Sequence, residues 1–318
     1  MKAKEWQEIY CTGIEQLSCN NMWAFGTESN QYLINLDGPL FQFVANENNA
    51  KLSLYRKIYR DGKMYCAGES KFYFTNEFYK KCYYFDIVDD SWYTYYDNDN
   101  GLKLDSGQCF FMNNNHYFLD YNASKLYQLK LVEDNIEKGH IEISNQWSLN
   151  YTPTEILSVV VLKDTLYYLS GISFYSLKIS NNAPVYEPIS SVTGIDEFSI
   201  FVTDYKNKIW ILNSATGVIE YDSTTQTATK IAEFPGNTRS TDFSKACLYY
   251  NGYLYYIDNN SKVYALNLQD TPTPPTPPTP PTPPTDVPEQ SGKSCGCLGL
   301  EFLLALAGLF IFRTIAMR

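Results

Sequence analysis

The chain has 318 residues, of which 44% are hydrophobic, and its formal net charge is −10. An acidic chain without a basic run before its end lacks the means to hold a phosphate backbone, so these totals exclude a nucleic-acid partner. The 28 Tyr and 18 Phe residues favour strands over helices, and about 200 to 250 residues can form one all-β domain.

The first segment, MKAKEWQEIYCTG, is polar and lacks the apolar run of a secretory signal. Within it, residues 5–11 form an alternating strand that has no neighbouring strand of its own. This start favours a cytoplasmic chain unless the natural chain begins further upstream.

One sequence unit then returns six times, at intervals of about 41 to 53 residues. Each copy begins with a strand and a tight turn of Asn, Asp or Gly, residues that tolerate the positive φ of hairpins. The expected turns are Asn20-Asn21, Asp61-Gly62, 113–115, Lys163-Asp164, Lys206-Asn207 and Asn251-Gly252. The second strands expected after them are MWAFG, KMYCAG, HYFLDY, TLYYLSG, KIWILN and YLYYID.

Alternating segments predict a third strand in each copy and a fourth in the first five copies. The expected third strands are QYLINL, CYYFDIV, KLYQLKL, SFYSLKI, GVIEYDS and KVYALNL, and the fourth strands are LFQFVA, WYTYY, QWSLN, VYEPI and ATKIAEF. Residues 5–11 supply the fourth strand of the sixth copy and place Trp6 where Trp92 and Trp147 stand in their copies. The sequence thus predicts a six-bladed β-propeller over residues 4–269, closed by its N-terminal strand.

The repeat resembles the kelch repeat, most clearly over residues 63–96. There KMYCAG matches the second strand, YYFDIVDDSW the third strand with its turn, and Trp92 the tryptophan of the repeat. The Gly-Gly pair typical of kelch repeats is replaced by pairs such as Ala67-Gly68. The resemblance implies a rigid propeller, a fold that serves an oxidase and many binding modules alike.

Two weak candidate sites lie next to each other in the second copy. Trp92, Tyr93 and Tyr95 could form an aromatic platform for a sugar, or could simply pack between blades. Asp97 and Asp99 offer oxygen ligands at alternate positions before a glycine, as in the first half of a calcium loop, but no Glu occupies the twelfth position.

The sequence has few residues that could form a copper, zinc or disulfide site. His116 and His140 are the only histidines, too few for an imidazole-rich copper site, and we expect both in solvent or in satisfied edge positions. The eight cysteines form no zinc pattern and are expected mainly as buried thiols, although Cys66 and Cys82 could pair if they lie on neighbouring strands. We expect no cofactor and no catalytic residue.

The C-terminal part is organised differently. Residues 270–294 include a Thr-Pro-Pro ladder, TPTPPTPPTPPTPPT, which favours a stiff polyproline II spacer of roughly 45 Å. Residues 295–318 then combine Cys295-Gly296-Cys297, an apolar run and terminal arginines. This segment predicts a single transmembrane helix, and it resembles the C-terminal sorting signals of bacterial surface proteins. That resemblance implies that the cysteine motif is a processing or attachment site.

These features predict a propeller that is held on a membrane and displayed outside the cell. We expect a non-catalytic module that binds a protein or a glycan through loops on one face. Two alternatives stay open: a carbohydrate-active surface enzyme with carboxylates at the propeller centre, and a cytoplasmic adaptor anchored by its tail.

Overall fold

The computed structural model describes most of the region from residue 4 to residue 269. The described ranges are 4–14, 22–26, 31–35, 40–46, 48–56, 63–68, 71–76, 80–86, 89–97, 102, 107–135, 138–150, 156–196, 198–235, 246–258 and 260–269. Compactness divides the chain into two units, Met1–Asp270 and Thr271–Arg318. The second unit, with the expected spacer and tail, lies outside the described residues.

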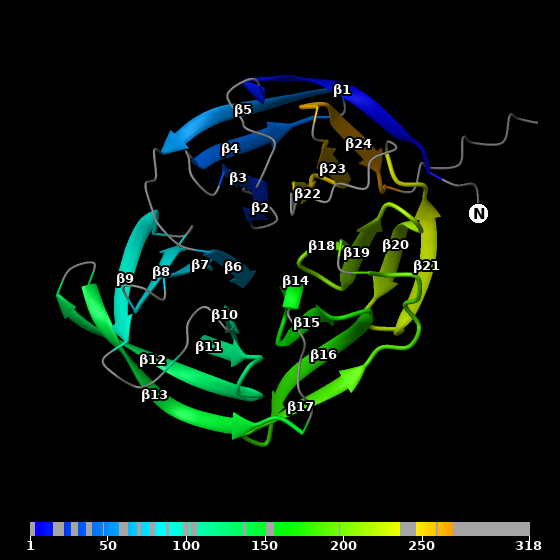
Figure 1. The fold of residues 1–318 in the computed structure, drawn as a ribbon. Coiled ribbons are helices and arrows are strands. Elements are labelled where there is room, and N and C mark those ends of the chain that lie inside the picture. The colour runs from blue at the N-terminus through cyan, green and yellow to red at the C-terminus, as the bar shows by residue number, and fades with distance from the viewer. Residues whose placement is uncertain are drawn as a thin grey trace, which may run out of the picture. The chain divides into compact units, whose positions relative to one another are not determined.

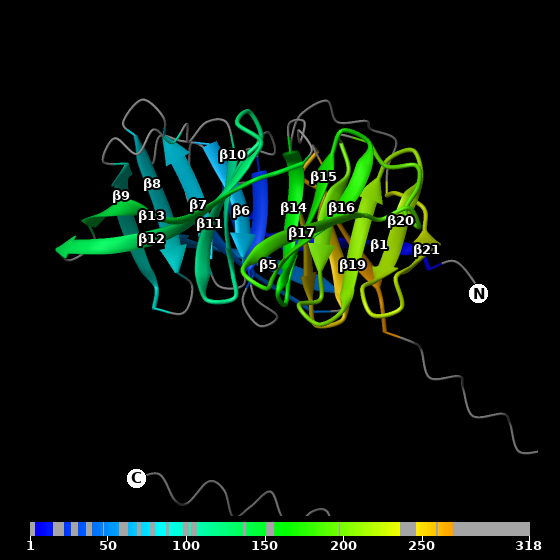
Figure 2. The same ribbon diagram turned by 90° about the horizontal axis from the view of Figure 1, so that it is seen from below.

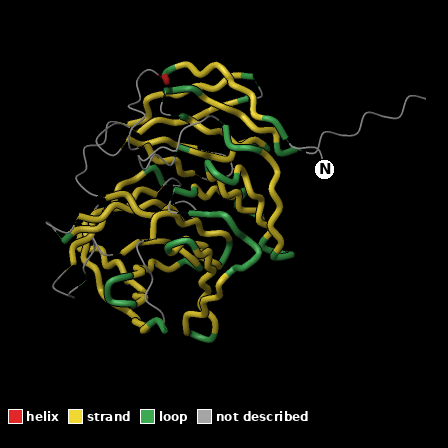
Figure 3. The backbone as a smooth tube through the Cα atoms, turned by 45° about the vertical axis from the view of Figure 1, so that its right-hand side comes forward, coloured by secondary structure: helices red, strands yellow, loops and turns green. Residues whose placement is uncertain are grey.

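Apart from a single 3₁₀ residue at Ile14, the described ranges are strands joined by turns and loops, as Figure 3 shows. This confirms the expectation of an all-β domain. In the part of the chain that the structure describes, we find no helix with the length and apolar character needed to cross a membrane.

The strands form antiparallel sets of four in chain order, which we number from the N-terminus. Set 1 contains β2 (Met22–Gly26), β3 (Gln31–Asn35), β4 (Leu40–Ala45) and β5 (Asn49–Arg56). Set 2 contains β6 (Lys63–Gly68), β7 (Lys71–Asn76), β8 (Lys81–Asp86) and β9 (Ser91–Asp97). Set 3 contains β10 (Gly107–Met112), β11 (Asn115–Asp120), β12 (Lys125–Asn135) and β13 (Lys138–Ser148).

Sets 4 and 5 follow the same chain order, and set 6 takes its fourth strand from the N-terminus. Set 4 contains β14 (Ile156–Leu162), β15 (Thr165–Ser170), β16 (Ser173–Ser180) and β17 (Ala183–Pro188). Set 5 contains β18 (Ile200–Thr203), β19 (Lys208–Asn213), β20 (Gly217–Asp222) and β21 (Thr227–Ala232). Set 6 contains β22 (Cys247–Tyr250), β23 (Tyr253–Ile257), β24 (Val263–Asn267) and, as its fourth strand, the N-terminal β1 (Trp6–Thr12).

The sets stand around a common centre, with the first strand of each set innermost and the fourth at the rim (Figure 1). Five apolar clusters fill the spaces between consecutive sets from set 2 to set 6 and between set 6 and set 1. Sets 1 and 2 meet through aromatic rings, because the Tyr32 ring on β3 lies 6.5 Å from the Phe85 ring on β8. Burial between sets therefore holds the domain together in a propeller-like ring.

The N-terminal strand closes this ring, as the sequence predicts. Trp6 to Ile9 pair antiparallel with β24, and Tyr10 to Thr12 pair parallel with β5 of set 1. A second parallel pairing joins β13 of set 3 to β9 of set 2. The two junctions leave fewer exposed strand edges at the rim.

The strand assignment in sets 1 and 2 differs from the sequence-based expectation. MWAFG and KMYCAG are the first strands of their sets and not the second, and LFQFVA is the third strand of set 1 and not the fourth. The strand β5 takes the place of the strand expected before the Asp61-Gly62 turn but belongs to set 1, and β7 is not predicted from the sequence. The kelch-like alignment over residues 63–96 is therefore wrong in its first part, because it passes over β7.

Two finer expectations also need correction. Trp6 and Trp92 are the first and second residues of the fourth strand of their sets, whereas Trp147 stands near the end of β13, opposite Leu126. Cys66 and Cys82 do not lie on neighbouring strands, since β7 separates β6 from β8. Strands two apart are about 9.6 Å from each other, too far for a disulfide.

Candidate binding surface

The antiparallel order fixes which connections share an end of the sheets. Connections between the second and third strands of a set lie at the same end as those that lead from one set to the next. Residues 171–172, 189–199 and 214–216 belong to three such connections, in sets 4 and 5. We call these three segments the loop surface.

The longest described part of this surface is the connection 189–199, between β17 and β18. Its Val192 and Ile195 are buried and pack in one apolar cluster with Phe174 and Phe201. The loop starts with a hydrogen bond from the Ile189 backbone N–H to the Phe174 carbonyl oxygen, at 2.7 Å. It is therefore anchored on the core and has a defined path.

A glycine allows this loop to approach the next turn closely. Gly194 has a φ of +74°, in the region that favours glycine, and a Cβ there would lie 2.4 Å from Thr216 Cγ2. Any larger residue at this position would push the loop away from the 214–216 turn.

The side chain of Asn213 joins the same two segments. It is 1% exposed, and its Nδ2 donates to Asp196 Oδ1 at 2.7 Å and to Ser199 Oγ at 3.0 Å. Its Oδ1 accepts hydrogen bonds from the backbone N–H groups of Ala215 at 2.8 Å and Thr216 at 3.2 Å. One buried amide thus satisfies the turn after β19 and fixes the loop before β18.

This anchored backbone carries apolar side chains into solvent. Phe198 is 41% exposed, and its backbone N–H donates to Asp196 Oδ1 at 3.0 Å. Ile172 is 77% exposed and lies two residues before Phe174, the residue on which the loop begins. Large apolar groups exposed on a fixed backbone are typical of interaction surfaces.

The aromatic residues expected as a sugar platform lie at the opposite end, or inside. Tyr95 is 2% exposed, and its ring stacks on Tyr84 with centroids 5.8 Å apart. Tyr93 stacks on the same ring at 4.8 Å, and its hydroxyl donates to Asp89 Oδ2 at 2.5 Å, which raises the pKa of Tyr93 to about 12. Trp92 packs on Phe85, on the other face of the sheet, at 5.1 Å. Tyr93 and Tyr95 pack in the apolar cluster between sets 2 and 3.

The expected calcium residues are only partly described. Asp97 ends β9, but its side chain, like Asp99, lies outside the described residues. The same is true of Cys295, Gly296 and Cys297. Among the side chains that the structure describes, no three His, Cys, Asp or Glu residues gather closely enough to hold a metal ion.

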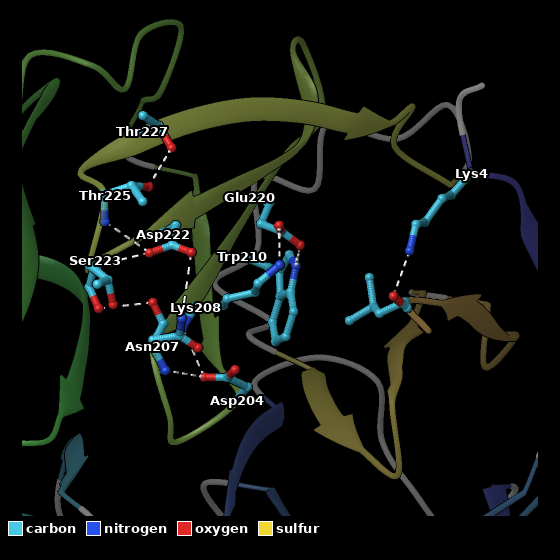
Figure 4. A network of polar contacts seen from close by, with 12 residues as sticks. Lys4, Asp204, Asn207, Lys208, Trp210, Glu220, Asp222, Ser223, Thr225 and Thr227 are labelled. Carbon is cyan, nitrogen blue, oxygen red and sulfur yellow. Dashed lines mark hydrogen bonds and ion pairs between the residues drawn. The ribbon is translucent and has the colours of Figure 1, made fainter. Parts of the chain in front are cut away.

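The buried carboxylates that the structure describes have structural partners. Asp86 forms an ion pair with Lys71, and Asp120 Oδ1 accepts from the Ala123 backbone N–H at 2.8 Å. Asp204 Oδ1 accepts three backbone N–H groups of its turn, at 2.8 to 2.9 Å, and Asp258 Oδ1 accepts two, at 2.8 and 2.9 Å. Figure 4 shows Asp204 beside two of its donor residues, Asn207 and Lys208. Each of these acids holds a turn or a sheet edge together.

The two histidines lie in different surroundings on set 3. The His116 ring lies between Tyr84, at 5.4 Å, and Phe111, at 5.1 Å; burial, and secondarily the charge of Lys71, lower its pKa to about 3. His140 is partly exposed, with Nδ1 at 2.8 Å from Asp134 Oδ1 and Nε2 at 3.5 Å from Glu142 Oε1, and its hydrogen bond to Asp134 is the main reason why its pKa is raised.

Comparison with known proteins gives only distant likenesses. No family model matches the chain, and no curated protein matches it. The N-terminal domain of Nup159 has 11% identity and a TM-score of 0.44, covering 77% of this chain and 75% of that one. YjhT has 11% identity and a TM-score of 0.48, with 79% and 93% covered. The Neurospora crassa Pan2 WD40 domain has 8% identity and a TM-score of 0.49, with 85% and 98% covered.

The sequence predicts a binding face formed by loops, but no local pattern indicates the loop surface in sets 4 and 5. The available signal was length: residues 189–199 connect two strands where most connections within sets are tight turns, and long loops often carry function.

Proposed function

We propose that the chain is a non-catalytic binding module whose loop surface contacts a protein. The six sets are, in this proposal, the six blades of one complete propeller. The observation that carries it is the exposed Phe198 ring on a loop fixed by the buried Asn213 amide. A pre-organised apolar side chain loses little entropy on binding, which is the usual character of an interface anchor.

A protein suits this surface better than a glycan does. Sugar rings are bound on flat aromatic faces together with polar groups, and the Trp92, Tyr93 and Tyr95 rings that could have served already pack against the Phe85 and Tyr84 rings of β8. Ile172, in contrast, is an aliphatic side chain 77% exposed, which favours an apolar protein partner.

Site-specific photo-crosslinking tests this proposal. A photoreactive phenylalanine analogue is placed at position 172 or 198 of the full chain in its source cells, with Asn114 at the opposite end of the sheets as the control position. We expect one discrete protein adduct from positions 172 and 198 and none from position 114. Adducts from position 114 alone, or no adduct from either loop position, would contradict a partner at the loop surface.

The sequence supports an additional proposal about location. Residues 295–318 would anchor the domain in a membrane and residues 271–285 would hold it away as a polyproline spacer, so that the propeller is displayed outside. The kelch-type relationship of the repeats is likewise a proposal, and it rests on the third and fourth strands of set 2.

Protease treatment of intact cells tests display separately from binding. We expect an external protease to release a fragment that contains the propeller by cutting before residue 295. Protection of the whole chain in intact cells, together with cleavage after lysis, would instead place the domain in the cytoplasm.

A further inference from the structure

Two buried cysteines face each other across the boundary between sets 2 and 3. Cys82 lies on β8 and Cys109 on β10, and their sulfur atoms are 3.9 Å apart. Their residues are 1% and 0% exposed, and both are thiols in this structure. The contact joins two different four-stranded sets.

The surroundings hold this pair in place. Cys82 and Cys109 belong to one apolar cluster with Tyr95, Leu102 and Phe118. Packed side chains of this kind leave the two thiols few alternative positions, so the short contact is a persistent feature of the fold.

The distance is close to what a disulfide needs. A disulfide has a sulfur–sulfur length of about 2.04 Å, so from 3.9 Å each sulfur has to move by about 1 Å. We expect rotation of the two side chains to supply most of this shift. Nothing comparable applies to Cys66 and Cys82, which β7 keeps apart.

We propose that Cys82 and Cys109 form an oxidisable pair that links set 2 covalently to set 3. The oxidant is a peroxide. One thiol reduces the peroxide O–O bond and becomes a sulfenic acid, with release of water. The second thiol then attacks that sulfur, and the S–S bond forms as a second water leaves.

The electron balance of these two steps is complete. Two thiols give up two electrons and two protons, and one peroxide is converted to two waters. A thiol reductant reverses the reaction by thiol–disulfide exchange.

Sets 2 and 3 are already joined by the parallel hydrogen bonds between β9 and β13, and a disulfide would add a covalent link between them. It closes a covalent loop of the chain between residues 82 and 109, which restricts the unfolded state and stabilises the fold. In an oxidising compartment the bond would persist, and in a reducing one it would form only transiently.

The test uses the full chain, treated under native conditions with hydrogen peroxide and then with an alkylating reagent. Trypsin cuts at Lys103, between the two cysteines, so a disulfide appears as two peptides joined with the loss of two hydrogen atoms. We expect this joined pair, its loss after dithiothreitol, and a rise of about 5 °C or more in Tm after oxidation.

Two variants separate the pair from other thiols. Cys82→Ala should lose both the joined peptides and the rise in Tm, whereas Cys247→Ala, which removes another buried thiol, should keep both. The proposal is wrong if peroxide leaves Cys82 and Cys109 alkylatable in the wild-type chain, converts either to a higher oxide without the joined peptides, or joins Cys82 to a different cysteine.

Discussion

Trp6 donates a hydrogen bond from its indole Nε1 to the backbone carbonyl oxygen of Glu233, at 2.7 Å. Two residues earlier, the Lys4 backbone N–H donates to the Ile231 carbonyl oxygen at 2.9 Å, and the Lys4 ammonium donates to the Leu268 carbonyl oxygen at 2.6 Å (Figure 4). The N-terminal segment therefore contacts set 5, completes set 6 and pairs with set 1. Figure 2, a view turned by 90°, also shows β1 beside β21.

The stability of the domain should depend on this segment. Ile9 is 6% exposed and packs in the apolar cluster between sets 1 and 6. We expect Ile9→Ala to lower the free energy of unfolding by about 2–4 kcal/mol, through lost burial and the cavity that remains. Urea unfolding followed by circular dichroism measures this change.

A matched control lies next to it on the same strand. Tyr10 is 71% exposed, so Tyr10→Ser should change the unfolding free energy by no more than about 0.5 kcal/mol. Equal effects of the two substitutions would mean that β1 is not packed as a fourth strand.

The turn between β18 and β19 should depend on one carboxylate. Asp204 Oδ1 accepts the backbone N–H groups of Lys206, Asn207 and Lys208, at 2.8 to 2.9 Å. Because Asp204→Ala leaves these donors without their acceptor, we expect a loss of about 1–3 kcal/mol in unfolding free energy. The exposed Asp164 in the β14–β15 turn is the control, and Asp164→Ala should have a much smaller effect in the same unfolding experiment.

His116 should make the fold sensitive to mild acid. Its pKa is lowered from 6.5 to about 3, so between these values the unfolded chain binds a proton that the folded chain does not. The contribution of neutral, buried His116 to the free energy of unfolding is fully present above pH 6.5. It is lost as the pH falls toward 3, by up to about 1.4 kcal/mol per pH unit. Relative to the wild type, His116→Phe should lose less unfolding free energy between pH 7 and pH 4.

His140 should make the stability of the domain depend on pH in the opposite direction. Its pKa is raised by the hydrogen bond to Asp134, so its contribution is fully present below the ordinary pKa and is lost as the pH rises through the folded pKa. In paired denaturation series across pH, His140→Gln should therefore cost stability at acidic pH and little at pH 9. If the free energy of unfolding of both histidine variants, relative to the wild type, changed with pH in the same direction, the surroundings described for His116 and His140 would be wrong.

The sequence predicts the strands of sets 4 to 6 and the first three strands of set 3, because their inner hairpins carry turn residues that leave a clear local signal. The fourth strand of set 3 is the exception, since the pattern predicts it at residues 146–150 and β13 spans Lys138–Ser148. Asn113, Lys163 and Asn251 all have positive φ in the turns after β10, β14 and β22. In sets 1 and 2 the same kind of turn residues led to a wrong prediction of the first hairpin. Asn20-Asn21 and Asp61-Gly62 stand between strands of different sets, so a local turn pattern could not distinguish a hairpin from a connection between sets.

The loop surface cannot be predicted from the sequence, for a different reason. Asn213 binds Asp196 and Ser199 only because the fold brings two connections together, and the sequence around each shows an ordinary polar loop. Nor does any spacing rule relate Cys82 to Cys109. Contacts between sets depend on how the sheets pack, and strand alternation specifies only which face of its own sheet a side chain occupies.

The Asn213 contacts predict a local change that does not unfold the domain. Asn213→Ala removes the bonds to Asp196 and Ser199, so the 189–199 loop should open more often and chymotrypsin should cut faster after Phe198. Limited proteolysis with mass spectrometry measures the rate. Asn145→Ala on β13 is the control, and an increase at Phe198 of the same size in that variant would indicate general destabilisation.

Binding of a protein partner through Phe198, as we propose, is tested by the affinity for the partner captured by crosslinking. Phe198→Ser is compared with Val185→Ser, which removes another exposed apolar side chain, 44% exposed, on β17. We predict that Phe198→Ser weakens binding at least about tenfold, with Tm unchanged, and that Val185→Ser weakens it less than about twofold. Equal affinities of the wild type and Phe198→Ser would show that the partner does not bind through Phe198.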